Sequence, residues 1–212
     1  MASDFVYGDE WEGREELLDE AETIVSRALS WTGKSWSARG TLTALPLVRP
    51  ALVSWDGYVD LEAFDDRIST ADPEIVVEMV SRMIEWRSRR WSVAERRVMP
   101  MPKTWWEPAA RAYPQLYTPP QYSLGWADIL LAATTWINES ETEWAFSDAK
   151  EKLGTLRLST RRLTLDHSYA IVDAAEYVAV HVCQVCGAPG TQSGDFMTLC
   201  HPHRAEKSWR LA

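Results

Sequence analysis

Cys183-Gln184-Val185-Cys186 and, further along the chain, Cys200-His201-Pro202-His203 place the strongest constraint on how this protein folds. Each pair brings two ligand side chains together from one tight turn, and the loop between the pairs lets all four converge on a tetrahedral zinc ion. Four protein ligands leave no open position for water, so a structural zinc is favoured over a catalytic one. We therefore expect a zinc knuckle over residues 183–203.

A redox role for the cysteines is the alternative, because Cys-x-x-Cys also forms the active disulfide of thioredoxin-like proteins. That pair usually stands at a helix N-terminus, whereas Cys183 follows a helical pattern and Cys186 precedes the turn residues Gly187, Pro189 and Gly190. The odd number of cysteines, three in all, also argues against a disulfide scaffold. The spacing therefore favours zinc.

The fourth zinc ligand is either His201 or His203. Cys-x-x-His spacing lets the side chains of Cys200 and His203 face one way from a turn, whereas His201, directly after Cys200, points elsewhere. The expected ligand set is therefore Cys183, Cys186, Cys200 and His203.

Size and composition are those of a globular protein. The chain has 212 residues, 46% hydrophobic and 25% charged, enough to bury a core as one large domain or two small ones. No apolar run approaches the roughly 18 residues that a membrane span needs, and no N-terminal hydrophobic segment suggests export. We expect a cytoplasmic protein that does not contact a membrane.

Charge is divided unevenly along the chain. Residues 1–80 hold 17 Asp/Glu against 6 Lys/Arg, whereas residues 81–212 hold 14 against 16. The acidic first part could contact a basic partner surface, and the second part could present a neutral or basic face to nucleic acid.

Hydrophobic periodicity and turn residues predict an α+β protein in which helices pack on short antiparallel strands. Two prolines in residues 99–104 mark a linker, so we expect an acidic α+β part over 1–99 and a second α+β part over 104–212 that ends in the zinc knuckle. The expected helices are 9–31, 72–98 with Asp72 as N-cap, a short one ending near Tyr117, 125–137, and 167–182 with Asp166 as N-cap. The expected strands lie within 35–64, with a turn at 55–58, and at 143–149 and 155–160, with a turn at Gly154.

Several cationic residues are candidates for binding a partner or an anion. Two Glu/Arg pairs have the four-residue spacing of ion pairs on an exposed helix face: Glu78 with Arg82 and Glu85 with Arg89. Arg87 and Arg90 fall instead on the apolar side of that helix, where they could contact a partner or a carboxylate across an interface. Lys152 and Arg157 on the expected hairpin could bind an anion.

The second part of the chain contains four distinctive sequence blocks. They are Tyr113-Pro114-x-Leu116-Tyr117, Gly125-Trp126-x-x-x-Leu130-Leu131, Lys150-Glu151-Lys152-Leu153-Gly154-Thr155-Leu156-Arg157, and Cys183-x-x-Cys186-Gly187-Ala188-Pro189-Gly190 before Cys200-x-x-His203. Together these blocks resemble an uncharacterised family of small bacterial and bacteriophage proteins. The family's third block usually reads Lys-Glu-Lys-Phe-Gly-Thr-Leu-Arg-Phe-Tyr, so Leu153 and Leu158-Ser159 depart from it. Its final pair usually reads Cys-Asp-Glu-His, which supports His203. The resemblance covers about residues 105–207 and implies a phage or mobile-element context, with no activity to carry over.

Three classes of function remain open from the sequence. The first is a non-enzymatic, zinc-stabilised module that binds another protein, as an inhibitor or modulator of a host nucleic-acid-handling or defence system. The second is a zinc protein that binds nucleic acid through a basic patch of Arg87, Arg90, Lys152, Arg161 and Arg162. The third is an enzyme with its site within residues 1–99.

Overall fold

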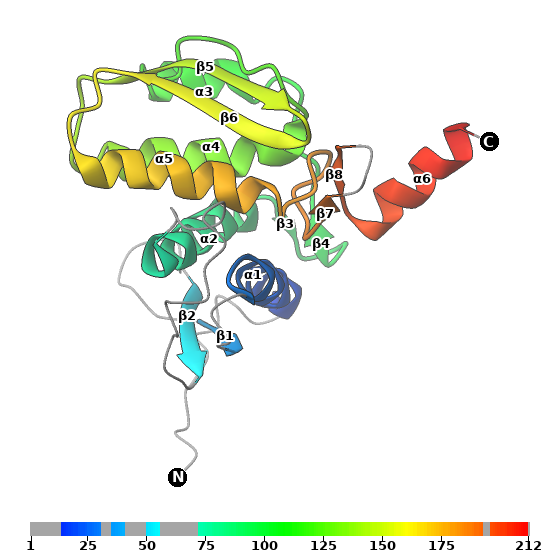
Figure 1. The fold of residues 1–212 in the computed structure, drawn as a ribbon. Coiled ribbons are helices and arrows are strands. Elements are labelled where there is room, and N and C mark those ends of the chain that lie inside the picture. The colour runs from blue at the N-terminus through cyan, green and yellow to red at the C-terminus, as the bar shows by residue number, and fades with distance from the viewer. Residues whose placement is uncertain (1–13, 31–34, 41–49, 56–71, 193–195, 212) are drawn as a thin grey trace.

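A computed structural model describes residues 14–30, 35–40, 50–55, 72–192 and 196–211 and has the expected α+β architecture (Figure 1). The first elements are α1 (Glu15–Ala28), β1 (Ser35–Gly40), β2 (Pro50–Trp55), α2 (Pro73–Ser88), β3 (Trp91–Ser92) and β4 (Arg97–Val98). They are followed by α3 (Trp106–Ala112), the 3-10 helix η3 (Leu124–Trp126), α4 (Ala127–Ile137), β5 (Ala145–Lys152), β6 (Thr155–Arg161), α5 (Asp166–Ala179), β7 (Thr191–Gln192), β8 (Thr198–Leu199) and α6 (His201–Leu211). All strands occur as antiparallel pairs in the described part of the chain. None of the described helices combines the length and the apolar character that crossing a membrane requires.

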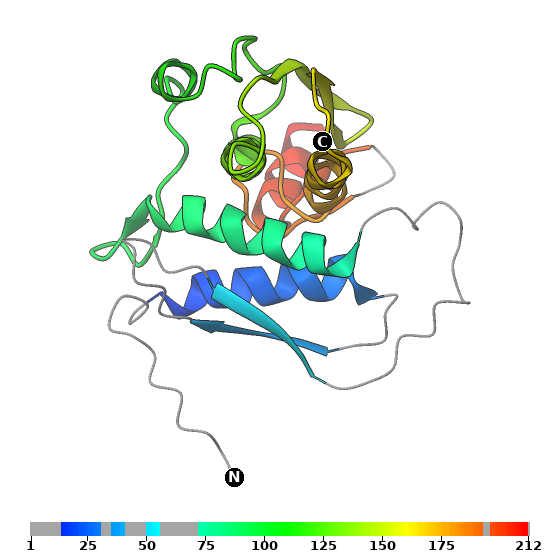
Figure 2. The same ribbon diagram turned by 90° about the vertical axis from the view of Figure 1, so that its left-hand side faces the viewer.

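The elements are stacked in layers (Figures 1 and 2). The β5–β6 hairpin lies over α4 and α5, these two helices pack on α2, and α1 lies between α2 and the β1–β2 pair. Side chains from α1, α2, α4, α5 and the hairpin belong to one buried hydrophobic cluster. Helices from both predicted parts therefore share one core, and a domain division at residues 99–104 stays a prediction.

The buried stripes of α1 and α2 match the predicted periodicity. In α1 they are Leu17, Leu18, Ala21, Ile24, Val25 and Ala28, and in α2 they include Val76, Met79, Val80, Met83 and Ile84. Asp72 is the N-cap of α2, as predicted, because its Oδ1 accepts a hydrogen bond from the Glu74 amide at 2.8 Å. The outer parts of the predicted helix 9–31 and the turn at 55–58 lie outside the described residues.

The prediction that α2 continues to about Val98 is wrong. The helix ends at Ser88, and the chain then forms the short β3–β4 hairpin. The Met99 amide donates to the Arg90 carbonyl at 2.8 Å, and Arg90 Nε donates to the Met99 carbonyl at 3.1 Å. These two bonds close the hairpin. The helical pattern of apolar residues continues beyond Ser88 in the sequence. The hydrogen bonds between Arg90 and Met99, nine residues apart, nevertheless fold this segment into a hairpin.

The β5–β6 hairpin agrees with the predicted strands and turn. Its turn holds Leu153 at φ +53° and Gly154 at φ +76°, and the Gly154 amide donates to Glu151 Oε1 at 2.6 Å. A Cβ at Gly154 would lie 2.1 Å from the carbonyl oxygen of Phe196, so the turn requires glycine. The helix predicted to end near Tyr117 is shorter than expected, because α3 ends at Ala112.

Helix α5 is capped from outside its own sequence. It begins at Asp166, and its N-cap position is Leu165, so the predicted Asp166 N-cap is wrong by one residue. The Glu141 carboxylate instead accepts hydrogen bonds from the Thr164 amide, the Thr164 hydroxyl and the Leu165 amide at 2.8, 2.7 and 3.1 Å. The hydroxyl of Ser168, together with these Thr164 and Leu165 groups, lowers the pKa of Glu141 to about 2.

We predict that Glu141→Gln destabilises the protein at neutral pH and that the difference from wild type disappears in acid. A lowered folded-state pKa stabilises the fold above the unfolded value, roughly 4.3 for Glu, and this contribution is lost as the pH falls toward about 2. Urea unfolding of both proteins at several pH values between 7 and 2 measures the effect. Glu143→Gln, two residues away on an exposed side chain, is the control. A difference for Glu141→Gln that does not change with pH would contradict the assignment.

Candidate metal centre

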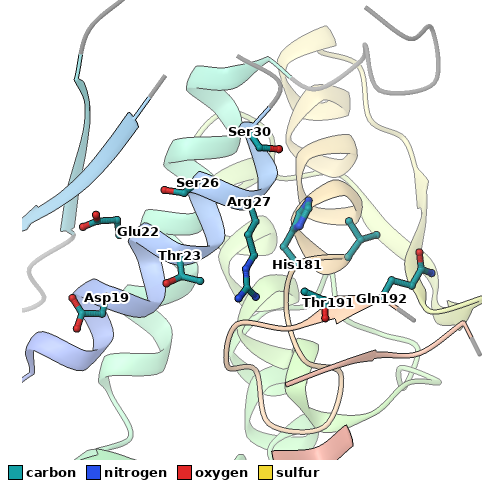
Figure 3. A pocket seen from close by; sticks show the side chains of 10 residues that line it. Asp19, Glu22, Thr23, Ser26, Arg27, Ser30, His181, Thr191 and Gln192 are labelled. Carbon is teal, nitrogen blue, oxygen red and sulfur yellow. The ribbon is translucent and has the colours of Figure 1, made fainter. Parts of the chain in front are cut away.

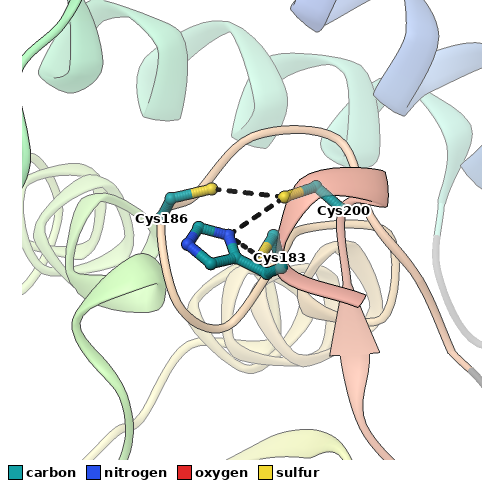
Figure 4. A group of neighbouring side chains, drawn as sticks. Cys183, Cys186 and Cys200 are labelled. Atoms are coloured by element: carbon teal, nitrogen blue, oxygen red, sulfur yellow. Dashed lines mark hydrogen bonds between the residues drawn. The ribbon is translucent and has the colours of Figure 1, made fainter. Parts of the chain in front are cut away.

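Cys183, Cys186, Cys200 and His203 lie close together and could bind a metal ion (Figure 4). One ligand atom from each residue lies within 4.8 Å of the other three. His203 Nδ1 is 3.1 Å from Cys200 Sγ and 3.6 Å from Cys183 Sγ, and the sulfurs of Cys186 and Cys200 are 3.7 Å apart. Ligand atoms of a tetrahedral site with metal–sulfur bonds of about 2.3 Å are roughly 3.8 Å apart. The four atoms are therefore spaced for one tetrahedral ion, and the group contains His203 rather than His201.

Backbone hydrogen bonds shape the turn that carries Cys183 and Cys186. The Gly187 amide donates to the Cys183 carbonyl at 2.8 Å, and the Cys183 amide donates to the Ala188 carbonyl at 2.7 Å. The Gln184 amide donates to the carbonyl of Thr198 in β8 at 3.0 Å, which brings the strand before Cys200 alongside. We call residues 183–203 the knuckle.

The three thiol groups differ in how readily they ionise. The hydrogen bond from Cys186, together with backbone amides of Cys200, Cys186 and Val185, lowers the pKa of Cys183 to about 4. The same side-chain contact raises the pKa of Cys186, and burial raises that of Cys200. Hydrogen bonds alone thus stabilise one thiolate. Since a metal takes cysteine as thiolate, a bound cation would supply the charge that ionises the other two.

Arg87 connects the knuckle to three helices. Its guanidinium extends from α2, is 3% exposed, and donates to the Cys186 carbonyl at 2.8 Å. It also makes two hydrogen bonds to the carboxylate of Glu20 in α1, at 2.9 and 3.1 Å, and lies 3.8 Å from Asp128 in α4. Burial alone would lower the pKa of Arg87, but Glu20 and Asp128 outweigh that effect and raise it. The cation is therefore permanent.

Arg90 continues this network away from the knuckle. Its two terminal nitrogens donate to the two Asp128 oxygens at 2.5 and 2.7 Å, and the Asp128 side chain is 3% exposed. Arg87 and Arg90 thus contact carboxylates of other helices inside the protein, one of the two roles considered from the sequence. Asp128 was not predicted. The signal was present, because it is the one charged residue in the apolar run 125–137.

The other predicted contact residues lie on the β5–β6 hairpin and do not join the metal group. Arg157 Nη1 donates to Glu176 Oε2 of α5 at 2.7 Å, and Lys152 is exposed near the turn. The knuckle does contact this turn, since Thr198 Oγ1 donates to the Gly154 carbonyl at 3.0 Å.

The segment before α4 also packs against the knuckle. The Gly125 amide donates to the Gln184 carbonyl at 2.8 Å, and Trp126 Nε1 donates to the Val182 carbonyl at 2.9 Å. A Cβ at Gly125 would lie 2.2 Å from the Cys183 carbonyl oxygen. The sequence placed Gly125 and Trp126 at the start of a predicted helix and in a resemblance, and the structure gives them a packing role against the knuckle.

A polar groove of about 820 Å³ separates the outer face of α1 from the knuckle (Figure 3). Arg27 extends across it from α1, and its Nη1 donates to the Gly190 carbonyl at 3.1 Å. Burial and the nearby Arg27 charge lower the pKa of His181, on the opposite wall, to about 4. The imidazole is therefore neutral at pH 7, and Arg27 is a second guanidinium contact between the first helices and the knuckle.

Comparison of the chain with protein-family models, with curated proteins and with solved structures gave no match. The resemblance to the bacterial and phage family therefore stays a prediction.

We predict that His203→Ala abolishes stoichiometric metal binding, whereas His201→Ala retains about one ion per chain. Loss of one of four ligands opens a tetrahedral site to water and exchange, while the exposed His201 lies outside the group. Metal content of the purified variants by mass spectrometry tests this. Retention of the ion by His203→Ala together with its loss from His201→Ala would reverse the assignment.

We predict that Asp128→Asn lowers the free energy of unfolding by about 3–5 kcal/mol, because it leaves the largely buried Arg90 cation without its carboxylate partner. Glu139→Gln is the matched control. Glu139 pairs with Arg82 at 2.5 Å but is 58% exposed, so its loss should cost about 1 kcal/mol or less. Denaturant unfolding measures both. If both variants lowered the free energy of unfolding equally, burial would not make the Asp128 ion pairs more important for stability than the exposed Glu139 pair.

Proposed function

We propose that this chain is a non-enzymatic, zinc-stabilised module that binds another protein through the surface beside its metal group. The observation that supports the proposal is a set of three exposed apolar side chains on the turns around the knuckle. These are Leu153, Val185 and Phe196, with 61%, 41% and 56% of their surfaces exposed. We call them the clamp surface.

The donor set favours zinc as the ion. Three thiolates and an imidazole suit a borderline-soft cation, and tetrahedral spacing is the geometry of structural zinc. Four protein ligands leave no position for a reacting water, which supports a structural role. Structural zinc contributes on the order of 10–16 kcal/mol of apparent binding free energy to folding. The knuckle has two-residue strands and a small buried cluster of Cys183, Leu199 and Cys200, so it would depend on that contribution.

Two residues of the clamp surface have a left-handed backbone that is unfavourable for their bulky side chains. Leu153 and Phe196 have φ values of +53° and +58°, a region that bulky residues adopt at a cost of order 1 kcal/mol or more. Burial does not offset this cost, because both side chains are exposed. Strained residues with exposed apolar side chains are typical of binding surfaces.

A hollow of about 320 Å³ adjoins this surface. Val185 lines it together with Met197, Leu199 and His203. A metal bound at His203 would hold one wall of the hollow in place, and a pre-organised surface loses less entropy when it binds. The metal would then favour partner binding by keeping the wall of the hollow rigid.

The nucleic-acid alternative has less support. Arg87 and Arg90 form their ion pairs with carboxylates of the protein itself. Of the five residues in the predicted basic patch, Lys152, Arg161 and Arg162 therefore remain exposed to a nucleic acid. Weak binding to DNA or RNA that persists only at low salt would fit such a small patch. The phage context and the action on a host system rest on the sequence resemblance.

We predict that Phe196→Gly reduces protein-partner binding about tenfold or more and leaves folding intact. Glycine accepts the positive φ at this position, so the change removes the side chain and the strain together. Val93→Ser is the matched control, because Val93 is 78% exposed on the β3–β4 turn, outside the clamp surface. Partners cross-linked in cells to the tagged chain are quantified by mass spectrometry, and unfolding checks stability. A partner set unchanged by Phe196→Gly, or tight salt-sensitive nucleic-acid binding by wild type, would contradict the proposal.

A further inference from the structure

A third concave surface lies beside Arg90, the residue that pairs with Asp128. It is a pocket of about 400 Å³ between the end of α2, the segment before α3, α3 itself and one side chain of α4. Its walls are mainly aromatic and aliphatic: Trp86, Met101, Trp105, Pro108, Tyr113 and Leu131. We call it the aromatic pocket.

Contacts among its walls hold the aromatic pocket open. Tyr113 meets the Trp86 ring edge-on at a centroid distance of 6.3 Å, and Trp86 Nε1 donates to Thr135 Oγ1 of α4 at 3.5 Å. Trp105 is 7% exposed and packs edge-on against Trp106 at 5.7 Å. The walls are therefore pre-formed, so a ligand would not have to order them.

The polar groups of the aromatic pocket lie at its edge. Arg90 is engaged by Asp128 and by the Met99 carbonyl. The Arg89 guanidinium lies 3.5 Å from the Trp86 ring centroid and reaches Glu85 only at 3.4 Å. Lys103 and Arg111 are exposed on the same wall elements, and neither has an ion-pair partner among the described residues.

Local charge is opposite to that of the whole protein. Residues 81–112, which supply all of the walls except Tyr113 and Leu131, hold 8 Lys/Arg against 3 Asp/Glu, while the chain carries a net charge of −9. Four of these cations (Arg82, Arg87, Arg90 and Arg97) pair with carboxylates, which leaves Arg89 and the exposed Lys103 and Arg111 on the wall elements. A pocket with apolar walls and cationic residues at its edge favours a ligand whose apolar group is flanked by acidic groups.

We propose that the aromatic pocket binds a bulky apolar side chain of an acidic peptide segment in a partner protein, with Arg89, Lys103 and Arg111 pairing with the flanking carboxylates. The volume accommodates one or two side chains, and the walls direct few polar groups inward to orient a small polar ligand. Stacked nucleobases fit less well, because Arg89 already covers a face of Trp86 and Trp105 is buried. This surface is separate from the clamp surface, so the two proposals can fail independently.

Fluorescence anisotropy with two labelled peptides tests the proposal on the full metal-loaded chain. The probe is Gly-Glu-Glu-Phe-Glu-Glu-Gly, and its neutral counterpart replaces every Glu with Gln. The acidic peptide should bind about tenfold or more tightly at low salt and lose that advantage as salt rises.

Two alanines of α3 provide a matched pair of variants. Ala112 is exposed and lines the pocket, whereas Ala110 on the same helix does not. Ala112→Glu should weaken binding of the acidic peptide about tenfold or more, and Ala110→Glu should leave it within about twofold. Arg89→Gln should reduce the salt dependence. Phe196→Gly should leave peptide binding unchanged, which separates this site from the clamp surface.

Four results would overturn the proposal. Equal affinity for the neutral peptide would remove the charge recognition, and equal effects of Ala112→Glu and Ala110→Glu would place binding elsewhere. A thymidine oligonucleotide that binds more tightly than the acidic peptide, and is released by Ala112→Glu, would assign the pocket to single-stranded nucleic acid. Self-association in sedimentation experiments that Ala112→Glu alone abolishes would make a second copy of the chain the occupant.

Discussion

The buried guanidinium of Arg87 is the contact on which the arrangement of the other parts depends. Burying a charge is costly unless its donors are used, and here Nε and Nη2 bind Glu20 while Nη1 binds the Cys186 carbonyl. The Arg87 side chain of α2 thereby holds both α1 and the knuckle at hydrogen-bonding distance from its guanidinium group. Asp128, shared with Arg90, adds α4 to this arrangement.

The same contact relates the helices to the metal group electrostatically. A divalent ion with three thiolates and a neutral imidazole carries one net negative charge, and Arg87 and Arg27 place two cations against carbonyls of the knuckle. Two guanidinium groups from α1 and α2, far away in sequence, would thus lie near the negative charge of such a group. Free energy that a bound metal would contribute to folding would therefore extend beyond residues 183–203 into the packing of the first helices.

The sequence predicted what local patterns determine and missed what distant contacts determine. The stripes of α1 and α2, the Asp72 cap, the β5–β6 turn and the four clustered metal-ligand side chains follow from spacing alone. The end of α2 at Ser88 and the capping of α5 by Glu141 depend on partners 9 to 24 residues away. The Glu20–Arg87 pair spans 67 residues, and a single sequence does not indicate which carboxylate a buried arginine meets.

Exposure of the clamp surface follows from the way the knuckle is held. The Gly154 carbonyl accepts from Thr198, and the Leu153 carbonyl accepts from Gln192 Nε2 at 2.8 Å, so the hairpin turn is joined to the knuckle through the carbonyls of its two left-handed residues. The missing Cβ at Gly154 lets Phe196 approach the turn closely. The side chains of Leu153 and Phe196 remain exposed beside these contacts. The apolar surface thus lies beside the same contacts that join the hairpin turn to the end of the fold that carries the cysteine and histidine group.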